Sequence, residues 1–215
     1  MSFSNSANNE RKPGTIVGNP LYGLCEKVCI QVNKVFDACL SQVTEENSIV
    51  TVTNPVPPNP TLPLTFISAK STSASGIVES LTITPLSDRQ GYSRVQAEIG
   101  IPIEVIYVDA NGIEGKGTAI YTVYKDVVML VPENSVIPVT LAATVNLVAP
   151  SGTYLSDMTF SITACVTIVL KIEAEVELLV PSYGYCQIPA CQDFSEEVCA
   201  GVFDLPLFPT LNNKI

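Results

Sequence analysis

The clearest pattern in this chain is an alternation of apolar and polar residues through residues 160–180. The even positions are all apolar, and the odd positions carry mainly Ser, Thr, Lys and Glu. A helix would spread these even positions around its circumference, so the pattern predicts a strand whose even side chains face the core. At about 3.3 Å per residue the run would be ~70 Å long, and we expect it to bend or break near residues 169–171.

Shorter alternating runs predict further strands. Residues 95–107 place apolar side chains at odd positions, with Pro102 on the opposite face. Proline lacks the N–H that a central strand donates, so we expect a bulge or a sheet edge there. The sequence Asp-Ala-Asn-Gly at residues 109–112 predicts a tight turn, because Asn-Gly tolerates the positive φ of hairpin turns. Other strands are expected within residues 28–32, 118–131 and 139–147.

Segments without periodicity divide the chain. Residues 1–24 are polar and irregular, residues 54–63 contain five prolines, and residues 71–76 are rich in Ser and Thr. We therefore predict an all-β fold, an antiparallel β-sandwich or barrel of about seven to nine strands. In this interpretation residues 1–24 form an N-terminal arm, residues 25–183 form the sandwich domain, and residues 184–215 form a Cys-containing C-terminal tail.

Composition excludes several classes of function. The 215 residues include 21 acidic and 11 basic ones, a formal charge of −10, whereas nucleic acid binding needs clustered Lys and Arg. The absence of His removes Ser-His-Asp and Cys-His nucleophile systems and His-ligated zinc. No window supplies the ~18 apolar residues of a membrane helix, and the polar start does not resemble a secretory signal. We expect a protein synthesised in the cytoplasm that binds neither nucleic acid nor membrane.

Seven cysteines leave several interpretations open. Six of them form two terminal clusters: Cys25, Cys29 and Cys39, and Cys186, Cys191 and Cys199. Their spacings do not match paired zinc knuckles, and no His completes a ligand set. We expect no metal site and treat the six as candidates for cross-links within or between subunits, with zinc and idle buried thiols as the alternatives. Cys165 alternates with apolar residues, so it should point away from the core as a free thiol.

Two further groups of residues are weighed for chemistry. Glu173, Glu175 and Glu177 share one strand face about 6.6–7 Å apart, which would suit Ca²⁺ or the carboxylate pair of a glycosidase. A solvated face that discourages edge-to-edge aggregation explains the same row, and we favour it. The Gly115-Lys116-Gly117 triplet lacks the strand–loop–helix context of a phosphate loop. We therefore predict a protein that is not an enzyme, without catalytic residues or cofactors.

Three stretches together resemble a known family: RVQAEIGIPIEVIYVDANGIEGKG, the link PENSVIPVTL and the run SITACVTIVLKIEAEVELLV. Over roughly residues 73–182 they are similar to the SPOCS-type β-rich domain of spore coat and sporulation proteins in clostridial spore formers. The flanks CEKVCIQVNKVFDAC and PSYGYCQIPACQDFSEEVCAGVFDLPLFP also resemble uncharacterised clostridial spore-associated proteins. The resemblance implies non-enzymatic assembly on a forming spore inside the mother cell. The larger members' tandem copies and peptidoglycan-binding module are missing here, which favours a building block over a recruiting scaffold.

These observations together predict a structural, self-assembling protein of the bacterial spore surface, in the coat, the exosporium or an appendage. It would polymerise with itself, and associate with other spore-layer proteins, through its terminal arms and the candidate cysteines. Oxidation after lysis of the mother cell would then lock the cysteine clusters. Two alternatives remain: a β-sandwich binding module, and a structural protein of a phage or virus particle.

Overall fold

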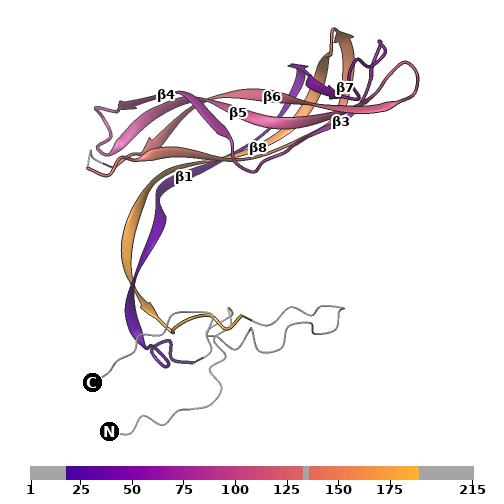
Figure 1. Ribbon diagram of the computed structural model, residues 1–215. Coiled ribbons are helices and arrows are strands. Elements are labelled where there is room, and N and C mark those ends of the chain that lie inside the picture. The colour runs from indigo at the N-terminus through magenta and orange to yellow at the C-terminus, as the bar shows by residue number, and fades with distance from the viewer. Residues whose placement is uncertain (1–17, 133–135, 189–215) are drawn as a thin grey trace, which may run out of the picture. The chain divides into compact units, whose positions relative to one another are not determined.

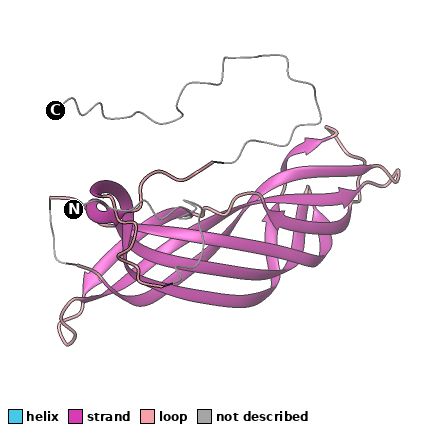
Figure 2. Ribbon diagram, turned by 90° about the horizontal axis from the view of Figure 1, so that it is seen from below, coloured by secondary structure: helices cyan, strands magenta, loops and turns pink. Residues whose placement is uncertain are grey.

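The computed structural model describes residues 18–132 and 136–188, and this part of the chain contains eight strands and no helix (Figures 1 and 2). The predicted all-β class is confirmed. The strands are β1 Glu26–Thr51, β2 Thr53–Val56, β3 Thr65–Ser71, β4 Ile77–Pro85, β5 Tyr92–Val108, β6 Glu114–Leu130, β7 Thr140–Ser156 and β8 Thr159–Ser182. They form one sheet in the order β1-β8-β7-β3-β5-β6-β2, with β4 paired to β5.

The chain divides into two compact units. Unit 1 consists of Met1–Gln31 and Glu177–Ile215, of which residues 18–31 and 177–188 are described. Unit 2 consists of Val32–Val176. Strands β1 and β8 each contribute residues to both units. The predicted arm and tail fall mostly outside the described residues.

The core of unit 2 is built from the alternating positions that the sequence predicts. Odd positions of β5, β6 and β7 and even positions of β8 are buried together, because β3 pairs with both β5 and β7 and so joins the two halves of the sheet. The predicted inward face of residues 95–107 is confirmed, and that of β8 is confirmed from Phe160 to Ala174. Each fully buried Val, Leu or Ile contributes ~1.5–3 kcal/mol. This core therefore provides most of the stability of unit 2.

An aromatic cluster fills one end of this core. The ring of Phe160 is completely buried and lies 5.7 Å from Phe66, 6.2 Å from Tyr107 and 5.8 Å from Tyr154, measured between ring centroids. Aromatic pairs at these separations add to the stability that burial alone provides.

Strand β8 is longer than the sequence suggested. Of the expected bend or break at residues 169–171, the break does not occur: β8 continues through them and pairs with β7 in regular register, with Val169 opposite Thr144. Strand β1 follows β8 in the sheet order, on the side opposite β7. Two neighbouring strands satisfy the backbone groups of β8, so the long strand needs no break.

Of the expected bulge or edge at Pro102, there is no bulge, and one side of Pro102 is a local edge without a paired strand residue. It lies opposite Ile120 in an unbroken β5–β6 register. On its other side, β3 ends opposite Ile103 and β4 begins opposite Gly100, and the Pro102 carbonyl accepts a hydrogen bond from the Thr72 N–H at 2.9 Å. The missing N–H of proline therefore faces the gap between two successive strands, where no ladder bond is lost.

Candidate functional site

The described part of unit 1 consists of the beginning of β1, the end of β8 and the residues next to them. The Cys25 N–H donates to the Ser182 carbonyl at 2.9 Å, and the hydroxyl of Tyr183 donates to the Pro20 carbonyl. No residue described in this unit is buried. Its large exposed apolar side chains are Leu21, Tyr22, Ile30, Leu178, Leu179, Tyr185 and Ile188. We refer to residues 18–31 and 177–188 as the terminal ribbon.

The terminal ribbon also carries three of the candidate cysteines. Cys25, Cys29 and Cys186 are free and exposed. The Sγ of Cys25 lies 3.4 Å from the Gly23 carbonyl, a local contact that leaves the sulfur accessible. Thiols must be accessible to exchange with an oxidant or a neighbouring chain, and these three are.

The other cysteines differ from this group. Cys39 belongs to unit 2, where it packs against the core. Burial raises the pKa of the Cys39 thiol, and the nearby carboxylate of Asp37 raises it further. Cys165 is exposed and free, as its position in the alternating pattern predicts. Cys191 and Cys199 lie outside the described residues, and no disulfide occurs among the five cysteines that the structure describes.

The acidic row on β8 does not form a metal site with its neighbours. Glu173 accepts a hydrogen bond from the side-chain amide of Asn33 at 3.3 Å. Within residues 18–132 and 136–188, no group of three or more Cys, Asp or Glu side chains is arranged to hold a metal ion.

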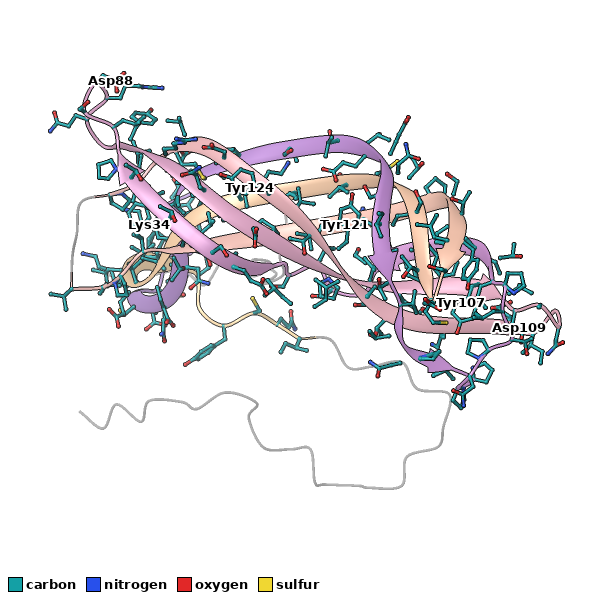
Figure 3. The ribbon with its side chains drawn as sticks, turned by 90° about the horizontal axis from the view of Figure 1, so that it is seen from above. Lys34, Asp88, Tyr107, Asp109, Tyr121 and Tyr124 are labelled. Atoms are coloured by element: carbon teal, nitrogen blue, oxygen red, sulfur yellow. The ribbon has the colours of Figure 1, made fainter. Side chains whose placement is uncertain are left out.

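Sequence reasoning missed a row of polar contacts between β1 and β6, strands that are not neighbours in the sheet order. Tyr121, labelled in Figure 3, lies on β6. Its hydroxyl lies 2.5 Å from a carboxylate oxygen of Glu45 and 2.8 Å from Ser48 Oγ. Its single proton goes to the carboxylate, and it accepts from Ser48. Lys125 Nζ donates to Ser41 at 2.8 Å, and the Leu130 N–H donates to Asp37 at 2.7 Å. We call these contacts the β1–β6 seam.

The register of β1 explains how its polar side chains reach the seam. Asp37, Ser41 and Glu45 share the odd face of the strand, whereas Ser48 and Val50 occupy even positions. Asn47 between them has a positive φ of 57°, which is typical of a residue that shifts the register of a strand. Burial raises the pKa of Tyr121 to about 12, and its hydrogen bond to Glu45 adds to this effect. The seam thus holds a protonated phenol against a carboxylate.

The predicted turn at residues 109–112 is confirmed and anchors the proline-rich connection. Asp109 accepts hydrogen bonds from the backbone of Ile113 at 2.9 Å, Asn111 at 2.8 Å and Thr61 at 3.2 Å. These bonds, that from Ile113 foremost, hold the pKa of Asp109 below its ordinary value. Gly112 supplies the positive φ of 78° that the turn requires. The Asp109 carboxylate therefore binds backbone N–H groups of the chain, and the Asn111 side-chain amide donates to the Thr61 hydroxyl at 2.9 Å.

The Gly115-Lys116-Gly117 triplet has a packing role. A Cβ at Gly115 would lie 2.6 Å from the ring of Tyr107, and one at Gly117 would lie 2.4 Å from Val52 and 2.8 Å from the Thr53 carbonyl. Only glycine permits the ring and strand β2 to approach this closely.

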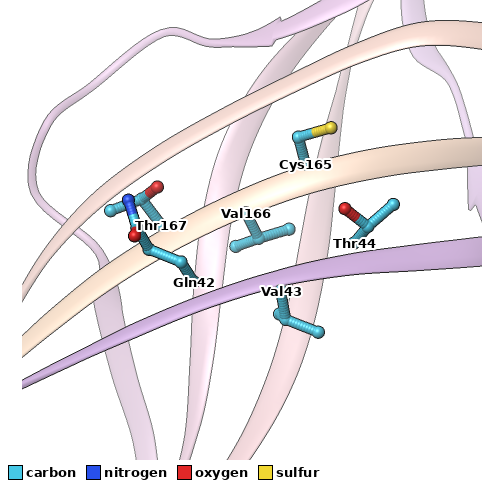
Figure 4. A pocket seen from close by; sticks show the side chains of 6 residues that line it. All are labelled: Gln42, Val43, Thr44, Cys165, Val166 and Thr167. Atoms are coloured by element: carbon cyan, nitrogen blue, oxygen red, sulfur yellow. The ribbon is translucent and has the colours of Figure 1, made fainter.

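A shallow hollow of about 270 Å³ lies on unit 2 between β1 and β8 (Figure 4). Its lining consists of Gln42, Val43, Thr44, Cys165, Val166 and Thr167. None of these side chains is charged, and the hollow contains no pair of titratable groups suited to acid–base chemistry.

Comparisons with known proteins found no match: no protein-family model, no curated protein and no solved structure is similar to this chain. Within the described residues there is no helix long and apolar enough to cross a membrane. The fold and the exposed surfaces define the chain as an all-β protein with a buried core in one unit and an uncovered, thiol-bearing ribbon in the other.

Proposed function

We propose that this chain is a non-catalytic structural protein that assembles with copies of itself through the terminal ribbon. The observation that carries the proposal is that the ribbon buries none of its described residues and exposes large apolar side chains, with Tyr22 at 75%, Leu21 at 69% and Leu179 at 68% exposure. Two strands without a covering layer are marginally stable in water. Contact with a neighbouring chain removes this apolar surface from water.

The exposed thiols of the ribbon give the assembly a means of becoming permanent. Two thiols, one from each chain, lose two protons and two electrons to an oxidant such as oxidised glutathione, which is reduced to two thiol molecules. Closing such a link typically adds ~2–4 kcal/mol where the geometry permits. Oxidation of this kind belongs outside a reducing cytosol. We assign the assembly to the surface layers of a bacterial spore, on the strength of the SPOCS resemblance.

The full chain tests this function. Purified under reducing conditions and then exposed to oxidised glutathione, it should form ladders on a non-reducing gel and regular assemblies in electron micrographs, both loosened by reductant. The variant Cys25→Ser/Cys29→Ser/Cys186→Ser should lose most of the ladder. The control Cys39→Ser, which removes a half-buried thiol that packs against the core of unit 2, should keep it. An oxidised wild-type chain that stays monomeric would contradict self-assembly, and an unchanged ladder in the triple variant would contradict the role of the ribbon thiols.

A further inference from the structure

The two outer faces of unit 2 differ in charge. The face formed by β4, β5 and β6 carries ion pairs, Arg94 with Asp126 and Lys116 with Glu104, the latter at 3.0 Å. The face formed by β1, β8 and β7 is uncharged over most of its length. Strand β7 has no charged residue, β8 has none from Thr159 to Leu170, and β1 has none at residues 38–44.

The pairing of β7 with β8 makes this uncharged stretch continuous. Cross-strand pairs place Val148 beside Cys165, Asn146 beside Thr167 and Thr144 beside Val169. Gln42 and Thr44 of β1 border the same hollow as Cys165 and Thr167 (Figure 4). We call this surface the neutral face: its outward residues are Leu40, Gln42, Thr44, Thr144, Asn146, Val148, Thr163, Cys165, Thr167 and Val169.

We infer that the neutral face is a second self-association surface, on which a second copy of this chain packs sheet to sheet. The inference rests on the proposed function and names a contact that the ribbon does not supply. Depletion of charged residues marks the centre of protein–protein interfaces. A chain with a formal charge of −10 repels its own copies, because like charges brought together across an interface are costly. The neutral face, bordered at Val148 by Lys70 of β3, is therefore where two copies can meet with the least repulsion between like charges.

The area of the neutral face is large enough for contact with a second copy. Three strands about 4.8 Å apart, whose uncharged stretches average roughly eleven residues of about 3.3 Å and are shortest in β1 at residues 38–44, cover on the order of 500 Å² per copy. Two copies would bury about 1,000 Å², which is the lower limit for a specific interface. The contact is thus suited to act together with the ribbon, since several modest contacts in one assembly reinforce each other.

Two valines provide a matched test. Val148 lies on the neutral face with 47% exposure, and Val128 lies on the charged face with 48% exposure. Each has a basic residue opposite it on a neighbouring strand, Lys70 for Val148 and Arg94 for Val128. Val148→Glu and Val128→Glu therefore introduce the same charge in similar surroundings on the two faces.

Sedimentation velocity of the full chains under reducing conditions measures the contact without disulfides. We expect the wild type and Val128→Glu to associate with increasing concentration, and Val148→Glu to associate at least tenfold more weakly. Circular dichroism and thermal unfolding show whether both variants keep the fold. Equal weakening by both variants, or none by Val148→Glu, would overturn the neutral face as an interface.

The same proteins distinguish this inference from the proposed function. If the wild type forms assemblies in electron micrographs after oxidation and Val148→Glu forms them equally well, the proposed function stands and the neutral face is excluded. If the wild type forms no assemblies and remains monomeric in the centrifuge, the proposed function and the neutral-face inference are both wrong. In a variant that keeps only Cys165, a short bifunctional maleimide should join two chains, and adding Val148→Glu should prevent this; joining that is unaffected by Val148→Glu would contradict the inference.

Discussion

Units 1 and 2 contain stretches of the same two strands, yet they differ completely in burial. On the even face of β8, Ile172 in unit 2 has no exposed surface, whereas Leu178 in unit 1 is 39% exposed. Every buried residue of the described chain lies in unit 2. Alternation along the chain thus produces a strand in either case, but it produces a core only where a second layer covers the apolar face.

The two units should therefore respond differently to substitution. Loss of a side chain from unit 2 changes the free energy of unfolding, because it leaves a cavity. Loss of an apolar side chain from the terminal ribbon should leave that free energy almost unchanged, because the side chain is already exposed to water, and under the proposed function it should weaken assembly.

Phe160→Ala should destabilise the monomer by about 3–5 kcal/mol, because it removes a fully buried ring from the aromatic cluster. Urea unfolding followed by circular dichroism under reducing conditions measures the change. A loss below about 1 kcal/mol would mean that the buried core is not the main source of stability in unit 2.

Tyr121→Phe should cost about 1–3 kcal/mol, because Glu45 and Ser48 lose their hydrogen-bond partner in the β1–β6 seam. The raised pKa of Tyr121, about 12 in the folded chain against about 10 unfolded, favours the protonated folded state. Its contribution is therefore complete below pH ~10 and is lost as the pH rises through about 12. Between these pH values, the midpoint temperature of thermal unfolding should fall more steeply for the wild type than for Tyr121→Phe. Parallel pH profiles would show that the phenol does not titrate with folding.

Tyr107→Phe should change the free energy of unfolding in the opposite direction to Tyr121→Phe. The hydroxyl of Tyr107 is buried and has no hydrogen-bond partner within the described residues, and leaving such a group dry is costly. Its removal should be neutral or raise the free energy of unfolding by up to about 1 kcal/mol, measured in urea beside Tyr121→Phe. A loss as large as that of Tyr121→Phe would reveal a partner for this hydroxyl.

Leu179→Ser should leave the stability of the reduced monomer within about 0.5 kcal/mol of the wild type, as is usual for exposed positions. The same variant should weaken assembly of the full chain, measured by light scattering after oxidation. If it destabilises the monomer as strongly as Phe160→Ala does, the terminal ribbon is buried in the free chain and the contrast between the units is wrong.

Some features of the structure could be predicted from the sequence, and others could not. The alternation at residues 95–107 and 160–174 predicts both strands and their inward faces. The seam could not be predicted in this way, because Glu45 and Tyr121 are 76 residues apart in the chain and lie on strands that are not neighbours in the sheet. Gly115 and Gly117 carry no pattern that identifies Tyr107 and Val52 as their neighbours. The cysteine cluster Cys25, Cys29 and Cys39 looked uniform, yet Cys39 packs against the core while the other two are exposed.

Local sequence predicts the strands at residues 95–107, 118–131, 139–147 and 160–174 and the turn at residues 109–112, because the period of two and the turn chemistry are local properties. It does not predict β4 or the length of β1, and long-range pairing sets which strands are neighbours and which surfaces stay exposed. This pairing placed Pro102 opposite the gap between β3 and β4, joined uncharged stretches of β1, β7 and β8 into one face, and left the terminal ribbon uncovered. These features depend on pairing between segments far apart in the chain, which no single stretch of sequence specifies.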